Sequence, residues 1–401
     1  MSKPLLIEVK GVQFRNKGAY LMLLATLQGL QKLGLSFQLV LSPGPNLPYI
    51  ERAKLGAWQK LSFRRYNVDL TPWFGKLPNA LRQFARRYGL VTEADVDVVL
   101  EASGFAYGDQ WPLQFLQNTA REVVRYHKAG KPFIFMPQAF GPFNTAASKA
   151  AMVDIIQHAT AIFVRDAASL EHLKQCQANL PAHVQLAVDF TIGLNTGAQA
   201  SGPLDGACEI TSPYAVLIPN HKVVSKFNHA QAELDYQSYV EAFAAAARHL
   251  AAKNFKVVLL NHEGREDAEI CQKIAQLSNA STLQIDDPLA LKQFIGGAQL
   301  VISSRFHGAI NALSQAVPCI TTSWSHKYQQ MMADFGVADY CLSEVSASHL
   351  ISKIEQLTQE RAAIEATLAE NSARLSQQNV QMWQSLGSLL AKFTADQKGS
   401  L

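Results

Sequence analysis

The feature that most constrains the fold is a repeated alternation of short apolar runs with longer segments whose apolar residues recur at helical spacing. Short connections join these segments, and that order predicts parallel sheets covered by helices on both faces. A stretch of Gly, Ala, Ser, Thr and Pro interrupts the alternation at residues 196–213 and predicts a linker. The predicted strands are residues 5–9, 37–41, 96–100, 133–136, 161–164 and 184–188 before the linker, and 214–218, 257–260, 283–285, 300–302 and 316–322 after it.

Two such sheets in tandem predict an α/β, GT-B-like fold, with two doubly wound parallel-sheet (Rossmann-like) domains and an interdomain cleft. We expect an N-terminal domain over residues 1–195 and a C-terminal domain over residues 214–345. Residues 346–401 are expected to form helices that pack back on the body, with a dimer coiled coil as an alternative that the order of charges does not favour.

The net charge of +4 is too small to indicate a nucleic-acid partner. The five cysteines are scattered singly, without metal-ligand spacing, which favours a reducing compartment. The first apolar run is too short for a signal peptide, and no run approaches the ~18 apolar residues of a membrane span. We therefore expect a cytoplasmic protein without metal or cofactor.

Residues 300–337 carry the pattern with the most chemistry: an apolar strand, the turn Ser303-Ser304, and an apolar-periodic helix. A serine at the turn is expected to cap the helix and to place Arg305 and His307 in its first turn, where backbone amides are unpaired. Two cationic side chains at a positive helix end predict an anion site for phosphate or carboxylate. The alternative is a solvated arginine and a core histidine.

This stretch resembles the polysaccharide pyruvyl transferase family, whose members share S-x-R-x-H, a helix, G-V-P, a strand and a lysine. The matching residues are Ser303, Arg305, His307, Val317, Pro318 and Lys327, with Ala316 where a glycine is more usual.

Further matches lie in the first half of the chain. Gln138 to Phe143 resembles the family's Q-S-I-G-P-F, Arg165-Asp166 opens an R-D-x-x-S, and Asp189 ends a strand. In the family an N-x-G loop is often followed by an acidic residue, but here Ala19 and Tyr20 follow Asn16-Lys17-Gly18. The chain also departs from the family at Gly104, where glycines are usually paired.

The resemblance implies transfer of the enolpyruvyl group of phosphoenolpyruvate to two hydroxyls of one sugar in a polysaccharide or lipid-linked oligosaccharide. The products are a cyclic pyruvate ketal and phosphate, in exopolysaccharide biosynthesis. The donor carries a carboxylate and a phosphate and needs separate cationic groups. We assign Arg165 and Arg305 to the donor anions, and His307 to phosphate binding and proton donation. The resemblance also implies that the N-terminal domain lies on the acceptor side and the C-terminal domain on the donor side.

The remaining candidates follow the carboxyl ends of predicted strands or belong to the family motifs. Open parallel sheets bind ligands at that edge, so these residues are expected to face one interdomain cleft. Asp166 has the alternatives of pairing with Arg165 or capping a helix. The donor-binding candidates are Lys327, Ser303, Ser304, His262, Lys17 and Asn16, and the candidates for acceptor binding or the general base are Gln138, Gly141, Asp166, Asp189, Glu263 and Gly104.

Two other functions stay open. A GT-B sugar-nucleotide glycosyltransferase would act on a nucleotide sugar and leave phosphoenolpyruvate inert; the D-x-D at Asp95 to Asp97 merely enters a strand. A non-catalytic carbohydrate-binding subunit of polysaccharide assembly would bind glycan without turnover.

Residues 51–90 hold nine basic residues and only two acidic ones. Apolar and basic side chains interleave there, which is typical of an interfacial helix near a lipid-linked acceptor and predicts peripheral contact with the membrane face. A solvated face over an ordinary core stripe is the alternative. The interleaved residues are Trp73, Phe74, Leu77, Leu81 and Phe84 with Lys76, Arg82, Arg86 and Arg87.

Overall fold

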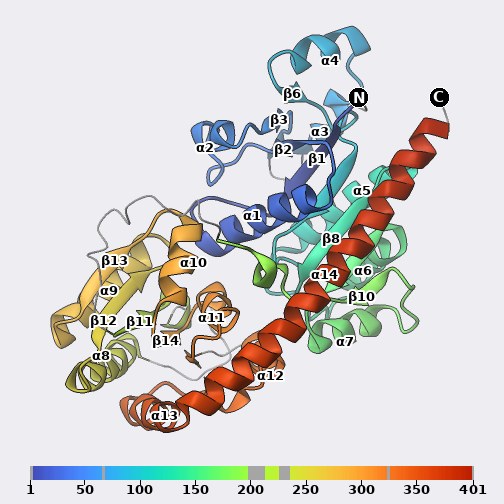
Figure 1. Ribbon diagram of the computed structural model, residues 1–401. Coiled ribbons are helices and arrows are strands. Elements are labelled where there is room, and N and C mark those ends of the chain that lie inside the picture. The colour runs from blue at the N-terminus through green and yellow to red at the C-terminus, as the bar shows by residue number, and fades with distance from the viewer. Residues whose placement is uncertain (1–2, 66–67, 197–212, 225–234, 323–325, 400–401) are drawn as a thin grey trace. The chain divides into compact units, whose positions relative to one another are not determined.

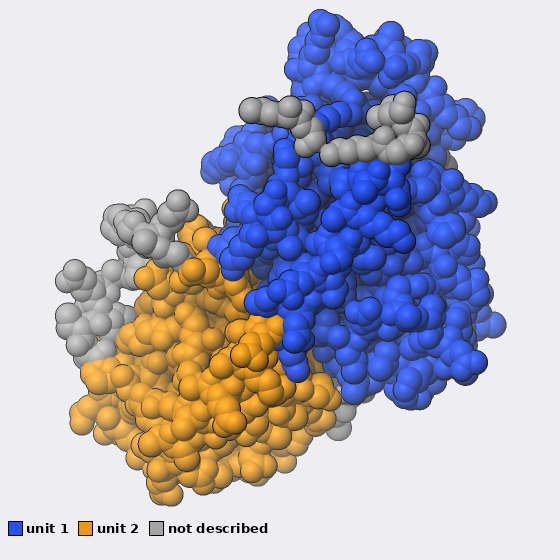
Figure 2. Space-filling model, turned by 45° about the vertical axis from the view of Figure 1, so that its right-hand side comes forward, with its two compact units in different colours: residues 1–14, 22–190, 378–401 blue, residues 15–21, 191–377 orange. Residues whose placement is uncertain are grey.

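The computed structural model describes residues 3–65, 68–196, 213–224, 235–322 and 326–399 (Figure 1). The chain divides into two compact units, shown in blue and orange in Figure 2. Unit 1 comprises residues 1–14, 22–190 and 378–401, and unit 2 comprises residues 15–21 and 191–377. Neither unit is continuous in sequence, because residues 15–21 group with unit 2 and residues 378–401 group with unit 1. Most of the predicted linker, residues 197–212, lies outside the described residues.

Unit 1 is built on a parallel sheet of eight strands in the order β10-β9-β8-β7-β1-β2-β3-β6. The central strands are buried on both faces, as a parallel sheet covered by helices requires. The strands are β1 (Leu5–Lys10), β2 (Phe37–Leu41), β3 (Trp58–Lys60), β6 (Leu90–Val91), β7 (Val98–Glu101), β8 (Phe133–Gln138), β9 (Ala161–Val164) and β10 (Val184–Leu186), with a separate antiparallel pair of β4 (Arg64–Arg65) and β5 (Val68–Asp69).

The helices of unit 1 alternate with its strands, as the apolar periodicity predicts. They are α1 (Lys17–Lys32), α2 (Tyr49–Lys54), α3 (Thr71–Phe74), α4 (Asn79–Arg86), α5 (Leu113–Lys128), α6 (Ala146–His158) and α7 (Ala167–Cys176). The 3₁₀ helix η1 (Phe190–Gly193) starts at the last residue of this part of unit 1 and continues into unit 2. The first turn of α1 belongs to unit 2 and the rest of that helix to unit 1.

Unit 2 contains a parallel sheet of six strands in the order β13-β12-β11-β14-β15-β16. The chain places β12 and β13 on one side of β11 and then crosses to β14 on the other side, so the strand order reverses beside β11. Ligands of open α/β sheets bind at the carboxyl edge next to such a reversal. The strands are β11 (Tyr214–Ile218), β12 (Lys256–Asn261), β13 (Ser281–Gln284), β14 (Leu300–Ser303), β15 (Cys319–Thr322) and β16 (Cys341–Leu342).

The helices of unit 2 are α8 (Tyr236–Ala252), α9 (Gly264–Ser278), α10 (Pro288–Gly296), α11 (Phe306–Leu313), α12 (His326–Asp334) and α13 (Ala347–Gln359), with the 3₁₀ helices η2 (His221–Val224) and η3 (Ala338–Tyr340). Helix α14 (Arg361–Gly399) starts in unit 2, and its last part belongs to unit 1. Within the described residues, no helix combines the length and apolar character needed to cross a bilayer.

The last part of α14 is held in unit 1 by close packing against α1. Gly29 of α1 lies under the indole of Trp383, so that a Cβ at this position would stand 2.2 Å from the ring. The Trp383 ring also meets Phe190 edge to face, at 6.4 Å between centroids. Glycine at position 29 is therefore required by the approach of the two helices.

We expect Gly29→Ala to lower the free energy of unfolding by about 1–3 kcal/mol, because the added methyl group overlaps the ring. At an unhindered helix position the same change would stabilise by about 1 kcal/mol. Urea unfolding measures the difference. Gly44→Ala is the matched control, since a Cβ there meets nothing within 4 Å. A gain in stability for Gly29→Ala would contradict the packing described.

Candidate functional site

The candidate site lies at the carboxyl edge of the unit 2 sheet, where β12 and β14 end. His262 and Glu263 follow β12 directly, and Ser304 and Arg305 follow β14. Parallel strands end at the same edge, so these residues come together although some forty residues of sequence separate them.

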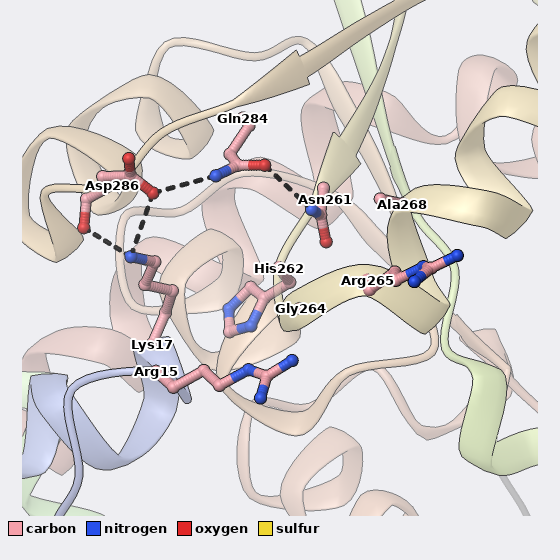
Figure 3. Close-up of a pocket in the computed structure, with 9 residues that line it drawn as sticks. All are labelled: Arg15, Lys17, Asn261, His262, Gly264, Arg265, Ala268, Gln284 and Asp286. Atoms are coloured by element: carbon pink, nitrogen blue, oxygen red, sulfur yellow. Dashed lines mark hydrogen bonds and ion pairs between the residues drawn. The ribbon is translucent and has the colours of Figure 1, made fainter. Parts of the chain in front are cut away.

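A cavity of about 360 Å³ opens beside β12 (Figure 3). Its lining carries three side chains with a full positive charge, Arg15, Lys17 and Arg265, and one carboxylate, Asp286. The excess of positive charge suits an anionic ligand. The full lining is Arg15, Lys17, Asn261, His262, Gly264, Arg265, Ala268, Gln284 and Asp286.

A chain of hydrogen bonds orders one wall of this cavity (Figure 3). Asn261 Nδ2 donates to Gln284 Oε1 at 3.2 Å, and Gln284 Nε2 donates to Asp286 Oδ1 at 3.1 Å. Lys17 Nζ donates to the backbone oxygen of Asp286 at 2.6 Å and lies 3.5 Å from its carboxylate. The hydrogen bond from Gln284, with Lys17, lowers the pKa of Asp286, so this carboxylate stays charged and positions the lysine.

The opposite wall contains the start of α9. Gly264 has φ +71°, a backbone conformation that glycine adopts readily, and Arg15 Nη2 would lie 3.2 Å from a Cβ placed there. Glu263, the N-cap of α9, makes no side-chain hydrogen bond to the first amides of the helix. A helix N-terminus favours anions, and here it adds to the side-chain charge.

His262 is the buried polar group of the cavity. Its side chain is 3% exposed, and its Nε2 has no hydrogen-bond partner among the described residues. Burial, reinforced by the positive charges of Arg305, His307 and Lys17, holds the pKa of His262 well below its usual range. The imidazole is therefore neutral near pH 7, with a ring nitrogen that a ligand can satisfy.

Arg305 is bound by two carboxylates. Its Nε and Nη2 donate to Asp267 Oδ2 at 2.9 and 2.5 Å, and its Nη1 pairs with Glu263. Burial alone would lower the pKa of Arg305, but Asp267 and Glu263 outweigh it and raise the pKa. Three of the five guanidinium N–H groups are thereby directed at protein carboxylates.

The two serines before Arg305 do not cap α11, contrary to the sequence prediction. Arg305 is the N-cap of this helix, and no side chain bonds to the first amides. Ser303 Oγ instead accepts from the backbone N–H of Arg305 at 3.1 Å and donates to its carbonyl oxygen at 2.8 Å. Ser304 Oγ lies 2.6 Å from the hydroxyl of Tyr239 and 2.5 Å from that of Thr322. Both hydroxyls serve internal structure because both serines are buried.

His307 lies in the first turn of α11, as predicted, and packs against the first turn of α1. A Cβ on Gly18 would stand 2.3 Å from His307 Nδ1, so glycine is required at this approach. Asn16 caps α1 by accepting from the Ala19 amide at 3.2 Å, and its Nδ2 donates to Glu263 Oε1 at 3.0 Å. The loop before α1 and the turn before α11 thus meet at Glu263.

Lys327, the family-motif lysine, lies in α12. Its Nζ is 5.5 Å from the centroid of the Phe306 ring and 5.6 Å from that of Tyr328. The hydroxyl of Tyr328 donates to the Ser304 carbonyl oxygen at 2.9 Å. The lysine is therefore tied by its aromatic neighbours to the same turn as Arg305.

The other candidates belong to unit 1. Arg165 Nη1 donates to Asp189 Oδ2 at 3.0 Å, and both residues are largely buried. Asp166 caps α7 by accepting from the Ser169 amide at 2.7 Å, which is one of the two structural alternatives for this residue. Gln138 Oε1 accepts from Ser103 Oγ at 2.9 Å. Gly104 and Gly141 both have positive φ angles, 74° and 84°.

Four residues of this part of unit 2, Arg15, Asp267, Gln284 and Asp286, have no local sequence pattern that predicts a functional role. Arg15 stands one position before the candidates Asn16 and Lys17. Asp267 lies inside α9, and its charge alone does not show that it faces the protein. Gln284 and Asp286 follow a short strand. In unit 1, Glu101 at the end of β7 is buried, and burial raises its pKa. A carboxylate at a strand end was the signal available for Glu101.

A family model described as polysaccharide pyruvyl transferase matches residues 16–326. The chain belongs to the polysaccharide pyruvyl transferase family. The match spans the segment from the α1 loop through β14, α11 and β15. It confirms the resemblance seen in the motifs around Arg305 and His307.

Solved structures similar to this pyruvyl transferase family member share its fold. UDP-GlcNAc 2-epimerase from Neisseria meningitidis, bound to UDP-GlcNAc, is 12% identical with a TM-score of 0.60, covering 96% of this chain and 99% of that chain. The UDP-GlcNAc 2-epimerase from Methanocaldococcus jannaschii is 9% identical with a TM-score of 0.57 (88% and 92% covered). An alpha,alpha-trehalose 6-phosphate synthase from Burkholderia multivorans is 13% identical with a TM-score of 0.53 (100% of both). At these identities the likeness concerns the fold, and it confirms two parallel-sheet α/β domains of the GT-B class.

The shared interdomain cleft and the individual donor and acceptor roles stay predictions. Within unit 2, the structure brings together Asn16, Lys17, His262, Glu263, Arg305 and His307. No group of three His, Cys, Asp or Glu side chains suited to a metal occurs among the described residues.

The lowered pKa of His262 predicts that the free energy of unfolding depends on pH. The unfolded chain takes up a proton at this histidine near pH 6.5 and the folded chain does not, so stability is present above that pH and is lost as the pH falls. Between about pH 7.5 and about pH 5.5 the wild type should lose about 1 kcal/mol more unfolding free energy than His262→Asn. Urea unfolding across this range measures the slopes.

His127→Asn is the matched control, because His127 is an exposed histidine. As the pH is lowered, the unfolding free energy of His127→Asn should fall as much as that of the wild type. Parallel curves for wild type and His262→Asn would show that the folded chain does not hold this imidazole neutral.

Proposed function

We propose that this protein transfers the enolpyruvyl group of phosphoenolpyruvate to two hydroxyls of one sugar, forming a pyruvate ketal and releasing phosphate. The observation that carries the proposal is the cationic cavity at the carboxyl edge of the unit 2 sheet, adjoining the family motif. A small donor with two anionic groups needs such charge, and each charge-assisted contact contributes about 1.5–3 kcal/mol. The sugar belongs to a polysaccharide or a lipid-linked oligosaccharide.

The reaction adds two sugar hydroxyls to one carbon. The methylene carbon of the donor gains a proton and becomes a methyl group, the first hydroxyl oxygen bonds to the neighbouring carbon, and the second displaces phosphate from it. One hydroxyl proton balances the proton gained by carbon, and the other leaves with phosphate. A general acid must reach the methylene carbon, and a base must take the hydroxyl proton.

In this proposal, Arg15 and Lys17 bind the donor phosphate, and the neutral His262 donates or accepts a hydrogen bond at its Nε2. His307 donates the proton to carbon. Arg305 acts as a positioning residue, because its guanidinium already holds Glu263 and Asp267 and fixes the turn that leads to His307. Arg165 keeps its predicted role at a donor anion, and Asp189, which pairs with it, stays a candidate base for the acceptor.

A sugar-nucleotide glycosyltransferase is the second candidate. The observation in its favour is that the diphosphate of a nucleoside diphosphate sugar would also suit the positive cavity beside α9. The two candidates differ in the donor that raises the melting temperature. Stabilisation by a sugar nucleotide, together with none by phosphoenolpyruvate, would replace the proposed function by this one.

The direct test is phosphate release from phosphoenolpyruvate with a panel of galactosides, glucosides and mannosides. We expect sugar-dependent release, and a loss of about 10- to 100-fold in kcat/KM for Arg305→Ala and for His307→Ala. Arg121→Ala, an exposed arginine of α5, is the control and should keep full activity. Release without any sugar, or full activity in both variants, would contradict the proposal.

Donor binding is tested separately from turnover. Phosphoenolpyruvate should raise the melting temperature of the wild type, and Lys17→Ala and Arg15→Ala should each weaken its binding about tenfold or more. Lys273→Ala removes one positive charge from the exposed face of α9, outside the cavity lining, and should bind normally. Equal binding by all four proteins would place the donor elsewhere.

A further inference from the structure

Helix α4 of unit 1 is oriented opposite to an ordinary surface helix. Such a helix packs its apolar stripe on the protein and presents its charged face to water. None of the residues of α4 is buried, although the helix includes Leu81 and Phe84. Figure 1 shows α4 at one end of unit 1, beyond the edge strand β6.

The basic side of α4 is the side that contacts the protein. Arg82 Nη1 and Arg86 Nη2 both donate to Asp95 Oδ1, at 3.1 and 2.8 Å. Asp95 is buried and is itself held by the amide and hydroxyl of Thr92, at 2.9 and 2.7 Å. Arg82 and Arg86 are one helical turn apart, so these ion pairs fix the rotation of the helix about its axis.

With the arginines turned inward, the apolar stripe points outward. Leu81 is 55% exposed and Phe84 is 56% exposed, and Tyr88, 69% exposed, continues the row with its ring 5.3 Å from that of Phe84. Trp73, just before the helix, is 66% exposed, and Lys76 Nζ lies 4.8 Å from its ring. We call these residues, with the exposed Leu70 and Leu77, the α4 surface: Leu70, Trp73, Leu77, Leu81, Phe84 and Tyr88.

The charge around the α4 surface identifies its partner. Lys54, Lys60, Arg64, Arg82 and Arg86 form ion pairs within unit 1. The exposed Lys76 and Arg87 border the apolar row. Trp and Tyr are enriched where a bilayer meets water, and basic side chains beside an apolar stripe bind anionic lipid headgroups. A lipid surface satisfies both the apolar row and the positive charges of Lys76 and Arg87.

We propose that the α4 surface docks this protein on an anionic membrane, with Leu81, Phe84 and Trp73 entering the headgroup region and Lys76 and Arg87 meeting the lipid phosphates. This docking is independent of the proposed function. It would bring the enzyme to a lipid-linked acceptor, but the contact itself needs neither donor nor sugar.

The test is sedimentation of the full chain with vesicles of phosphatidylcholine containing phosphatidylglycerol, compared with vesicles of phosphatidylcholine alone. We expect binding to the anionic vesicles that falls as salt is added. The double variant Leu81→Gln/Phe84→Gln should bind the anionic vesicles at least about tenfold more weakly, because two apolar side chains no longer enter the bilayer. Lys76→Glu/Arg87→Glu should lose binding to anionic vesicles to a similar degree.

Matched controls come from unit 1. Leu186→Gln/Val380→Gln changes two other exposed apolar residues, and Arg121→Glu/Lys128→Glu reverses two other exposed charges. Both should bind vesicles as the wild type does, and unchanged circular dichroism and melting temperature would show that every variant folds. If the α4 variants bind like their controls, the proposal is wrong. A lipid-free dimer that Leu81→Gln/Phe84→Gln dissociates would equally overturn it, in favour of a second copy as the partner.

Discussion

The buried ion pairs of Arg305 organise the candidate site. One guanidinium joins Asp267 inside α9 to Glu263 at the start of that helix, while its backbone begins α11. Removing one partner of a buried pair leaves a charge without compensation, which costs about 3–5 kcal/mol. Glu263 also accepts a hydrogen bond from Asn16, so the start of α1 is tied to the same network. Three segments distant in sequence are thereby held at one edge of the sheet.

This network also explains the electrostatics of the cavity. Arg305 is neutralised by its carboxylates, whereas Arg15 and Lys17 face the cavity, where Asp286 is the one carboxylate in the lining. Burial opposes protonation of the His262 imidazole and lowers its pKa, and the positive charges of Arg305, His307 and Lys17 act in the same direction. The site therefore offers positive charge together with a neutral nitrogen. A dianionic donor would use the charge, and a proton-sharing contact would use the nitrogen.

The same physical rule, that a buried charge must be paired, operates at α4 in unit 1. Asp95 draws Arg82 and Arg86 toward the protein, and the helix can then present only its other side to the surroundings. An ion pair thus determines where apolar side chains are exposed. The amphipathic sequence of α4 does not by itself show which side of the helix faces the protein. Either the arginines or the apolar row could face inward.

The sequence by itself determined the order of the longer strands and of the helices between them, since a buried parallel strand needs a short apolar run whatever its neighbours are. It missed the two- and three-residue strands β3, β6 and β16, which are too short to give an apolar pattern. The strands at Phe37–Leu41, Ala161–Val164 and Tyr214–Ile218 have the bounds that the sequence predicts. It also located Arg305 and His307 through a local motif. It failed where a side chain has two competing partners: Ser303 bonds to the backbone of Arg305 and does not cap α11. Only the tertiary structure decided that Arg305 pairs with Asp267, because contacts between distant segments depend on which faces the folded sheet brings together.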